Sequence, residues 1–110
     1  GALTMVVPQT PHCAVSQLVT QENMIALRVS SHPIARALAR GLGRPLVATS
    51  ANKSGEPPAF RVEGLPLWKN VLVLDVGPLP KNKPSTLVRV VGDAVEVLRK
   101  GSIRVGPVTR

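Results

Sequence analysis

Short apolar runs alternate along the chain with clusters of Gly, Pro and small polar residues, and this pattern predicts strands. The runs are rich in Val, Leu and Ile. They lie at residues 3–8, 24–29, 45–49, 71–76, 86–91 and 94–99. The last two flank Gly92-Asp93, a spacing that predicts a β-hairpin with a tight turn.

One segment has helical periodicity. Ile34, Leu38 and Leu42 recur at four-residue spacing, and arginines occupy the opposite face. Ser31 is expected to cap this helix and Pro33 to lie in its first turn, with glycines ending it near residues 41–43. A further helical turn is expected around residues 14–19. Six strands with one clear helix indicate an α/β fold with a mixed, open sheet.

The charge favours anionic partners. The formal net charge is +8, from 14 Lys and Arg against six Asp and Glu. Such a surface suits nucleic acid, nucleotide phosphates or an acidic membrane, although a basic surface without a ligand explains it equally well. Only Phe60 and Trp68 are aromatic, which argues against a platform that stacks single-stranded bases.

Cysteine usage and hydropathy indicate the compartment. Cys13 is the only cysteine, so an intrachain disulfide is excluded and a reducing, cytoplasmic location is expected. His12 beside it lacks further ligands at metal-binding spacing, so no metal site is expected. No apolar run approaches a membrane span, and no leader peptide is evident, so no membrane partner is expected.

The strongest candidate for binding chemistry is the polar stretch from Ser50 to Gly55, which follows the predicted strand 45–49. Ligands of open α/β sheets bind at the carboxyl ends of strands. Ser50 and Ser54 can donate to phosphate oxygens, and Asn52 can both donate and accept. A structural turn explains this spacing about as well.

Two other polar stretches, residues 81–86 and 99–102, also adjoin predicted strands and could converge with the first on one anion. Arg28 is predicted to lie inside the strand 24–29, among apolar neighbours. Its guanidinium either faces solvent or pairs with a carboxylate or phosphate, and the sequence leaves both open.

Several of these segments, in order, resemble the YrdC-like family, the threonylcarbamoyl-AMP synthases. The most specific is Thr49-Ser50-Ala51-Asn52-Lys53-Ser54-Gly55. The resemblance covers nearly the whole chain and includes residues 3–8, 25–29, 32–33, 43–55, 84–88 and 98–103.

The resemblance implies synthesis of threonylcarbamoyl-AMP and pyrophosphate from L-threonine, bicarbonate and ATP, with Mg²⁺. The product would serve threonylcarbamoyladenosine modification of tRNA. By the matching motifs, Ser50 and Asn52 would contact the adenylate's phosphate and threonyl portions, and Ser85 would help to hold the nucleotide. Arg99 would reach its phosphate or ribose, and Arg28 would face the threonine carboxylate. Secondary binding positions are Thr4, Ser54 and Thr86.

The resemblance also implies a partial domain. Residues 1–110 are expected to be a single YrdC-like domain without its N-terminal part, where family members carry a Lys-x-Arg motif. Catalysis would then belong to a longer protein of which this chain is the C-terminal portion. Two other readings stay open. One is an inactive basic module that binds double-stranded RNA or tRNA, and the other is a fragment that folds with a missing segment or as a homo-oligomer.

Overall fold

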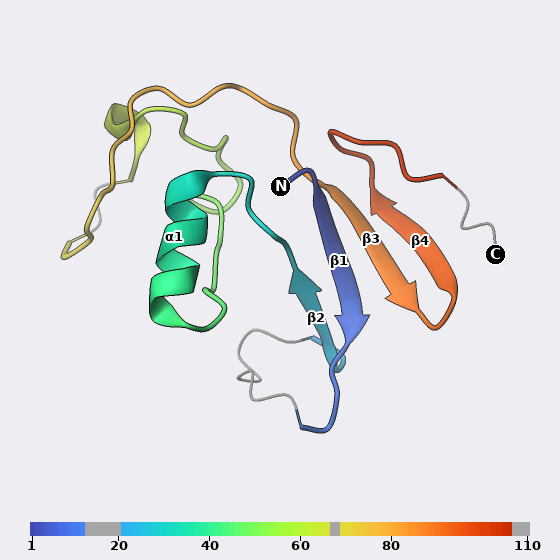
Figure 1. The fold of residues 1–110 in the computed structure, drawn as a ribbon. Coiled ribbons are helices and arrows are strands. Elements are labelled where there is room, and N and C mark those ends of the chain that lie inside the picture. Colours follow the sequence, from blue (N-terminus) through green and yellow to red (C-terminus); the bar gives the residue numbers. More distant parts are fainter. Residues whose placement is uncertain (13–20, 67–68, 107–110) are drawn as a thin grey trace. The chain divides into compact units, whose positions relative to one another are not determined.

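The computed structural model describes residues 1–12, 21–66 and 69–106. The chain divides into two compact units, which we describe separately. Unit 1 comprises Gly1–Leu46 with Lys83–Arg110, and unit 2 comprises Val47–Asn82. Among the described residues, the α-helix and all the strands belong to unit 1 (Figure 1).

The strands of unit 1 form a mixed, open sheet, so the predicted α/β fold class is confirmed. The strands are β1 (Leu3–Pro8), β2 (Met24–Leu27), β3 (Thr86–Val91) and β4 (Ala94–Arg99), in the spatial order β2-β1-β3-β4. β1 and β3 are parallel, whereas β2 and β4 run antiparallel to their neighbours. Consequently, the amino ends of β1 and β3 meet the carboxyl ends of β2 and β4 at one end of the sheet, the upper end in Figure 1.

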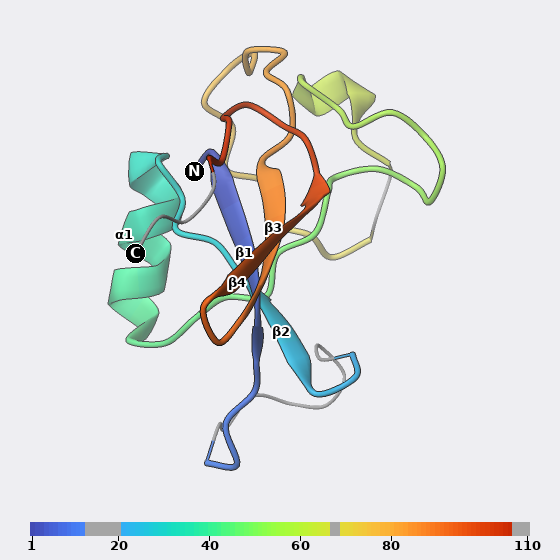
Figure 2. The same ribbon diagram turned by 90° about the vertical axis from the view of Figure 1, so that its right-hand side faces the viewer.

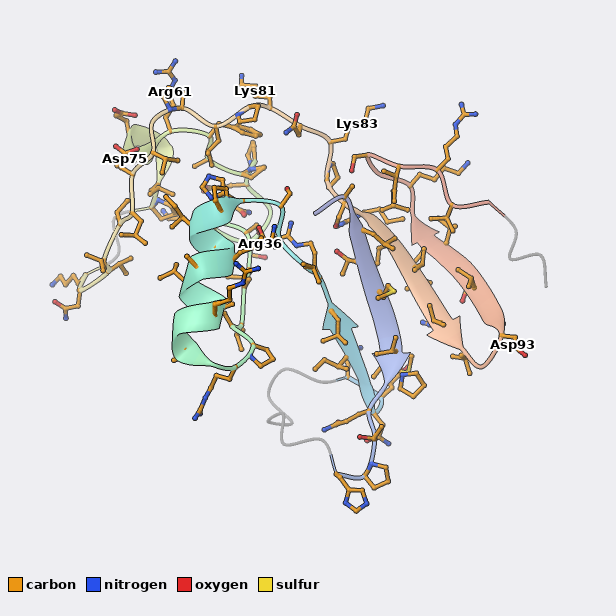
Figure 3. The ribbon with its side chains drawn as sticks, in the orientation of Figure 1. Arg36, Arg61, Asp75, Lys81, Lys83 and Asp93 are labelled. Carbon is orange, nitrogen blue, oxygen red and sulfur yellow. The ribbon has the colours of Figure 1, made fainter. Side chains whose placement is uncertain are left out.

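The predicted hairpin is confirmed. β3 and β4 pair from Val91↔Ala94 outward, with Gly92 and Asp93 as the two loop residues. Gly92 has a φ of 57°, the positive value that a type II′ turn requires at its first central position. A glycine reaches that value without steric cost, which explains why this sequence turns here. Asp93 lies at the tip of the turn (Figure 3).

Burial in the described part of the sheet is greatest on β3. Thr86 and Val88 are 1% and 2% exposed, and they lie on the same face because side chains alternate along a strand. Met5 of β1 and Val97 of β4 are the neighbours of Val88 in register. The opposite face of β3 carries Ser85 and Leu87, which are only partly buried.

The helix α1 extends from Pro33 to Leu42, as its periodicity predicts, and Figure 2 shows it to one side of the strands. Gly43 ends it with a φ of 68°, and its N–H donates to the carbonyl oxygens of the last turn. The predicted cap at Ser31 is wrong. His32 is the N-cap residue and makes no side-chain cap; instead its N–H donates to Ser30 Oγ at 3.1 Å, a local bond that competes with capping. Arg36 projects from this helix (Figure 3).

Two predicted strands are wrong. Residues 45–49 and 71–76 have no strand structure, although their composition is apolar. Val47 and Leu72 are 78% and 86% exposed. A strand requires a backbone partner as well as apolar side chains, and unit 2 has no strand among its described residues to provide one. The helical turn expected at residues 14–19 lies outside the described residues.

Unit 2 consists mainly of loops closed by a few backbone bonds. Its regular element is the 3₁₀ helix η2 (Val62–Gly64). The Leu79 N–H donates to the Phe60 carbonyl at 2.8 Å, which joins two segments distant in sequence. A mostly apolar hollow of about 130 Å³ lies beside them, lined in part by Phe60, Leu65 and Leu74.

Candidate functional site

Three polar side chains of unit 1 meet at the upper end of the sheet. Thr4 Oγ1 and Ser85 Oγ share a hydrogen bond of 2.7 Å. Arg99 Nη2 donates to the same Ser85 hydroxyl at 3.3 Å. We call Thr4, Ser85 and Arg99 the Ser85 cluster. It joins residues 81 positions apart in sequence, from three neighbouring strands or strand ends.

Strand register places these side chains on one face. Thr4 lies beside Leu87 in the parallel pairing, and Ser85 precedes Leu87 by two residues. The side chains of Thr4, Ser85 and Leu87 therefore share a face. Arg99 would face the other side in a regular hairpin. However, β4 has a β-bulge: Leu87 pairs with Arg99 while Val88 pairs with Val97. The extra residue between them, Leu98, turns Arg99 onto the face of Ser85.

The guanidinium of Arg99 is held by the backbone carbonyl of Ser85, the residue before β3. Nε and Nη2 donate to the Ser85 carbonyl oxygen at 3.3 and 2.9 Å. Arg99 is exposed to solvent, and the described residues offer it no carboxylate. The described ion pair on this sheet is Arg89–Glu96, at 3.7 Å. Arg99 therefore has N–H groups and a positive charge available for an anion.

Thr86, next to Ser85, differs from the cluster in its burial. It is 1% exposed, and its hydroxyl donates to the Ile103 carbonyl at 2.6 Å. It also accepts from the N–H groups of Gly101 and Ile103, both at 3.2 Å. A hydroxyl has one proton and two lone pairs, so that of Thr86 has no hydrogen-bonding capacity left.

Arg28 lies just beyond β2, because that strand ends at Leu27 and not at residue 29 as predicted. Extending the β1–β2 register by one residue places Arg28 opposite Thr4, at the end of the sheet that holds the cluster. The Arg28 Cγ lies 3.8 Å from the position that a Cβ atom would occupy at Gly1. The pKa of the Gly1 amino group is lowered, first by burial and then by the Arg28 charge. Arg28 is exposed and adds a second cation to this end.

In unit 2, the predicted polar loop is organised by Asn52. Its Nδ2 donates to the carbonyl oxygens of Lys53 and Glu56 at 2.9 and 2.8 Å. Two carbonyl partners fix which amide atom is nitrogen. The Asn52 Oδ1 is buried and has no donor among the described residues. Ser50 and Ser54, in contrast, are exposed.

Replacing Asn52 tests this loop closure. Asn52→Ala removes two hydrogen bonds, and we expect it to lower the free energy of unfolding by about 1 kcal/mol. Asn52→Asp should cost more, because it also places a carboxylate oxygen, which only accepts, against two carbonyl oxygens that repel it. Urea titration measures both. Asn82 is exposed, and toward the described residues it makes a backbone bond and no side-chain bond, so Asn82→Ala is the control, expected within about 0.5 kcal/mol of the parent. Equal effects at the two positions would contradict the closure.

The structure brings together part of the predicted site. Ser85 and Arg99 meet, with Thr4, as the convergence of the later polar stretches predicts. Ser50, Asn52 and Ser54 belong to unit 2, so their convergence with the cluster stays a prediction. Residues 81–86 divide between the units. Lys81 lies 5.9 Å from the centre of the Phe60 ring, within unit 2, as a cation–π contact.

Sequence reasoning missed the bulge at Leu98 and the role of the turn from Gly101 to Ile103. The only available signal was the run Arg99-Lys100-Gly101-Ser102, in which a glycine follows a strand.

The described residues contain no group of three His, Cys, Asp or Glu side chains placed to hold a metal ion. Within the same residues, no helix is long and apolar enough to cross a membrane.

Comparison with known proteins gives the family. The family model Sua5/YciO/YrdC, described as "Telomere recombination", matches residues 1–101. The threonylcarbamoyl-AMP synthase of Bacillus subtilis (strain 168) is 32% identical over 106 residues, which are 94% of this chain and 31% of that protein. The protein of the same name from Stenotrophomonas maltophilia (strain K279a) is 46% identical over 65 residues, 59% of this chain and 34% of that protein.

The matched region spans about a third of the length of these two relatives. No solved structure was found to match. The family model nevertheless covers most of the sequence, including the three residues of the Ser85 cluster. The chain therefore belongs to the Sua5/YciO/YrdC family.

Proposed function

We propose that this chain forms part of the substrate site of a threonylcarbamoyl-AMP synthase. The reaction converts L-threonine, bicarbonate and ATP to threonylcarbamoyl-AMP, pyrophosphate and water, and its product would serve tRNA modification. The observation that carries the proposal is the Ser85 cluster, two hydroxyls and a guanidinium in contact at one end of a sheet. Family membership and the names of the relatives support it over an RNA-binding module.

The cluster suits phosphoryl chemistry. In the proposed reaction, the threonine nitrogen bonds to the carbon of bicarbonate, and a C–O bond of bicarbonate breaks and its oxygen leaves as water. An oxygen of the resulting carbamate then bonds to the α-phosphorus while the bond from that phosphorus to pyrophosphate breaks and pyrophosphate leaves. Such a transfer depends on positioning and on stabilising negative charge, which requires no nucleophilic side chain. Arg99 would bind a phosphate oxygen with the N–H groups that Ser85 does not use. Thr4 and Ser85 share one hydrogen bond, so the hydroxyl that accepts in it would donate its own proton to the phosphate.

The remaining predicted residues take roles by charge and position. Arg28, at the same end of the sheet, would bind the threonine carboxylate. In unit 2, the Asn52 Oδ1 is buried and has no donor within the described part of the chain. This supports a role in ligand binding, because such an atom costs free energy until a donor reaches it. Ser50 would donate to the adenylate phosphate, with Ser54 as a secondary contact.

Magnesium fits this site as a companion of ATP. The Ser85 cluster contains hydroxyls and a cation and no carboxylate, so it suits phosphate oxygens better than a bare metal ion. Mg²⁺ is commonly held by substrate phosphates with few protein ligands. When bound to the triphosphate, it would neutralise part of the phosphate charge. The protein's own residues then orient the α-phosphate.

Titration with MgATP, followed by amide NMR, tests the proposal. We expect shifts confined to residues near 4, 85–86 and 99–101 and to the loop 50–55. We also expect pyrophosphate release by the synthase of which this site is part to require both threonine and bicarbonate. A well-dispersed spectrum that does not respond to MgATP would contradict nucleotide binding by this chain. Pyrophosphate release that is independent of threonine would contradict the proposed reaction.

Ser85→Ala gives a matched test of the cluster. The change removes one hydroxyl that touches both Thr4 and Arg99, and we expect MgATP affinity to fall about fivefold, the value of one neutral hydrogen bond. Thr10→Ala is the control, because Thr10 is exposed beyond the carboxyl end of β1. Isothermal titration calorimetry measures both. Equal MgATP affinities for Ser85→Ala and Thr10→Ala would show that the Ser85 hydroxyl does not contribute to nucleotide binding.

A further inference from the structure

We infer that Thr86 is a positioning residue for the Ser85 cluster. Its buried hydroxyl fixes the turn Gly101–Ile103 against the segment Pro84–Thr86, and this contact holds Ser85 and Arg99 in register. The inference rests on the proposed function for the identity of the bound anion. It adds a residue that acts without touching the substrate.

The hydroxyl of Thr86 connects to the turn by all three of its possible hydrogen bonds. It accepts from Gly101 and Ile103 N–H and donates to the Ile103 carbonyl. At 1% exposure, water cannot replace these partners without opening the structure. Removing the oxygen would therefore leave two backbone donors of the turn without their partner.

Other contacts tie the same turn to the start of the sheet. The Ser102 N–H donates to the Pro84 carbonyl at 3.0 Å, and Ser102 Oγ donates to the Ala2 carbonyl at 3.4 Å. The Thr86 N–H also donates to the Ala2 carbonyl, at 2.8 Å. The turn, the start of β3 and the start of β1 thus form one hydrogen-bonded unit, with Thr86 at its centre.

The packing at Gly101 shows how closely the two segments approach. A side chain at Gly101 would overlap the Pro84 carbonyl oxygen and the backbone of Ser85 and Thr86. The turn therefore lies directly on the backbone that carries Ser85.

Arg99 is connected to this contact from both sides. It lies two residues before Gly101 in the chain, and its guanidinium bonds to the carbonyl of Ser85, the residue before Thr86. A separation of the turn from Pro84–Thr86 would therefore act on the arginine through its own backbone and through the carbonyl that its guanidinium contacts. This coupling distinguishes Thr86 from a residue that only fills the core.

Two substitutions separate the hydroxyl from the shape of the side chain. Thr86→Val keeps the branched shape and removes the oxygen, whereas Thr86→Ser keeps the oxygen and removes a methyl group. The direct readout is the Arg99 Nε–H signal in NMR and its rate of exchange with solvent. We expect slow exchange in the parent and in Thr86→Ser, and loss of that protection in Thr86→Val. The amide signals of β2 should stay at their parent positions in both variants.

Retained Arg99 Nε–H protection in Thr86→Val would overturn the inference, since the arginine would then be positioned without the hydroxyl. Loss of protection in Thr86→Ser to the same extent would also overturn it. Should valine prevent folding, the pair Thr86→Ala and Thr86→Ser makes the same comparison. This readout needs no ligand, so it decides the positioning role even if MgATP does not bind.

The nucleotide gives a second, independent readout. We expect Thr86→Val to weaken MgATP binding about tenfold, with Thr86→Ser close to the parent. In an Arg99→Ala background, Thr86→Val should cause little further loss, because both changes remove the same contact. Additive losses would overturn the positioning role. Absence of MgATP binding by the parent, together with lost Arg99 protection in Thr86→Val, would refute the proposed function alone.

Discussion

Replacing Arg99 with alanine is expected to weaken MgATP binding by about 30-fold, the largest effect among the cluster residues. The guanidinium is fixed by the Ser85 carbonyl, at 2.9 and 3.3 Å, and is exposed to solvent with no carboxylate partner among the described residues. A charge-assisted hydrogen bond to phosphate contributes about 1.5–3 kcal/mol, which corresponds to roughly ten- to a hundredfold in affinity. Isothermal titration calorimetry at fixed ionic strength measures the change.

Arg89→Ala is the matched control for this experiment. Arg89 is an exposed arginine of the same sheet, and it pairs with Glu96 at 3.7 Å. An exposed ion pair contributes little, so both stability and affinity should stay close to the parent. If the two variants lost affinity equally, the effect would be one of net charge, and Arg99 would have no specific place in the site.

Replacing Gly101 with alanine is expected to lower the free energy of unfolding by about 2–3 kcal/mol. The new methyl group would overlap the Pro84 carbonyl oxygen and the Ser85 and Thr86 backbone. These are main-chain atoms at and just before the start of β3, where the Thr86 N–H is bound to the Ala2 carbonyl, so they cannot rotate away as a flexible side chain could. Chemical denaturation measures the loss, and amide spectra should show its largest changes at residues 84–86 and 99–103.

Gly41→Ala gives the opposite expectation at a glycine of the same unit. Gly41 lies inside α1, and a side chain there would meet nothing within 4 Å. Alanine has the higher helix propensity, so this variant should gain about 0.5–1 kcal/mol. Stability of Gly101→Ala equal to that of the parent would show that the turn does not pack on the start of β3 as described.

Local sequence signals predicted the elements that local chemistry decides. The strand Leu3–Pro8 has the predicted bounds, and the hairpin turns at Gly92, where a positive φ is required. The helix begins at Pro33 and ends before Gly43, as its periodicity and glycines indicate. Each depends on residues within a few positions of one another, which is why a sequence pattern could reveal it.

The two incorrect strands show where such signals fail. Residues 45–49 and 71–76 have the composition of buried strands, but composition reports a preference for burial and not the presence of a backbone partner. In this chain Leu72 is 86% exposed. Pairing depends on which segments come together in space, and no pattern within the run itself contains that information.

For the candidate site too, sequence signals indicate some of the residues, whereas the contacts between them depend on the tertiary structure. Ser85 and Arg99 lie in polar stretches that the sequence singles out, since hydroxyls and cations near strand ends suit a phosphate, and the family resemblance adds Thr4. The contact of Thr4 with Ser85 could not be predicted, because these residues are 81 positions apart and meet through the pairing of β1 with β3. The bulge at Leu98 has no signature in the sequence, yet it decides which face Arg99 occupies.

The sequence by itself determined the α/β class, the helix, the hairpin and the types of residue that could bind an anion. The motifs also gave the family, which comparison then confirmed over residues 1–101. Only the tertiary structure showed that the Ser85 side chain contacts Thr4 and Arg99 while its neighbour Thr86 is buried and fully hydrogen-bonded. The reason is physical: side chains alternate along a strand, and the pairing of the strand decides which of two adjacent hydroxyls faces solvent and which is buried under the turn.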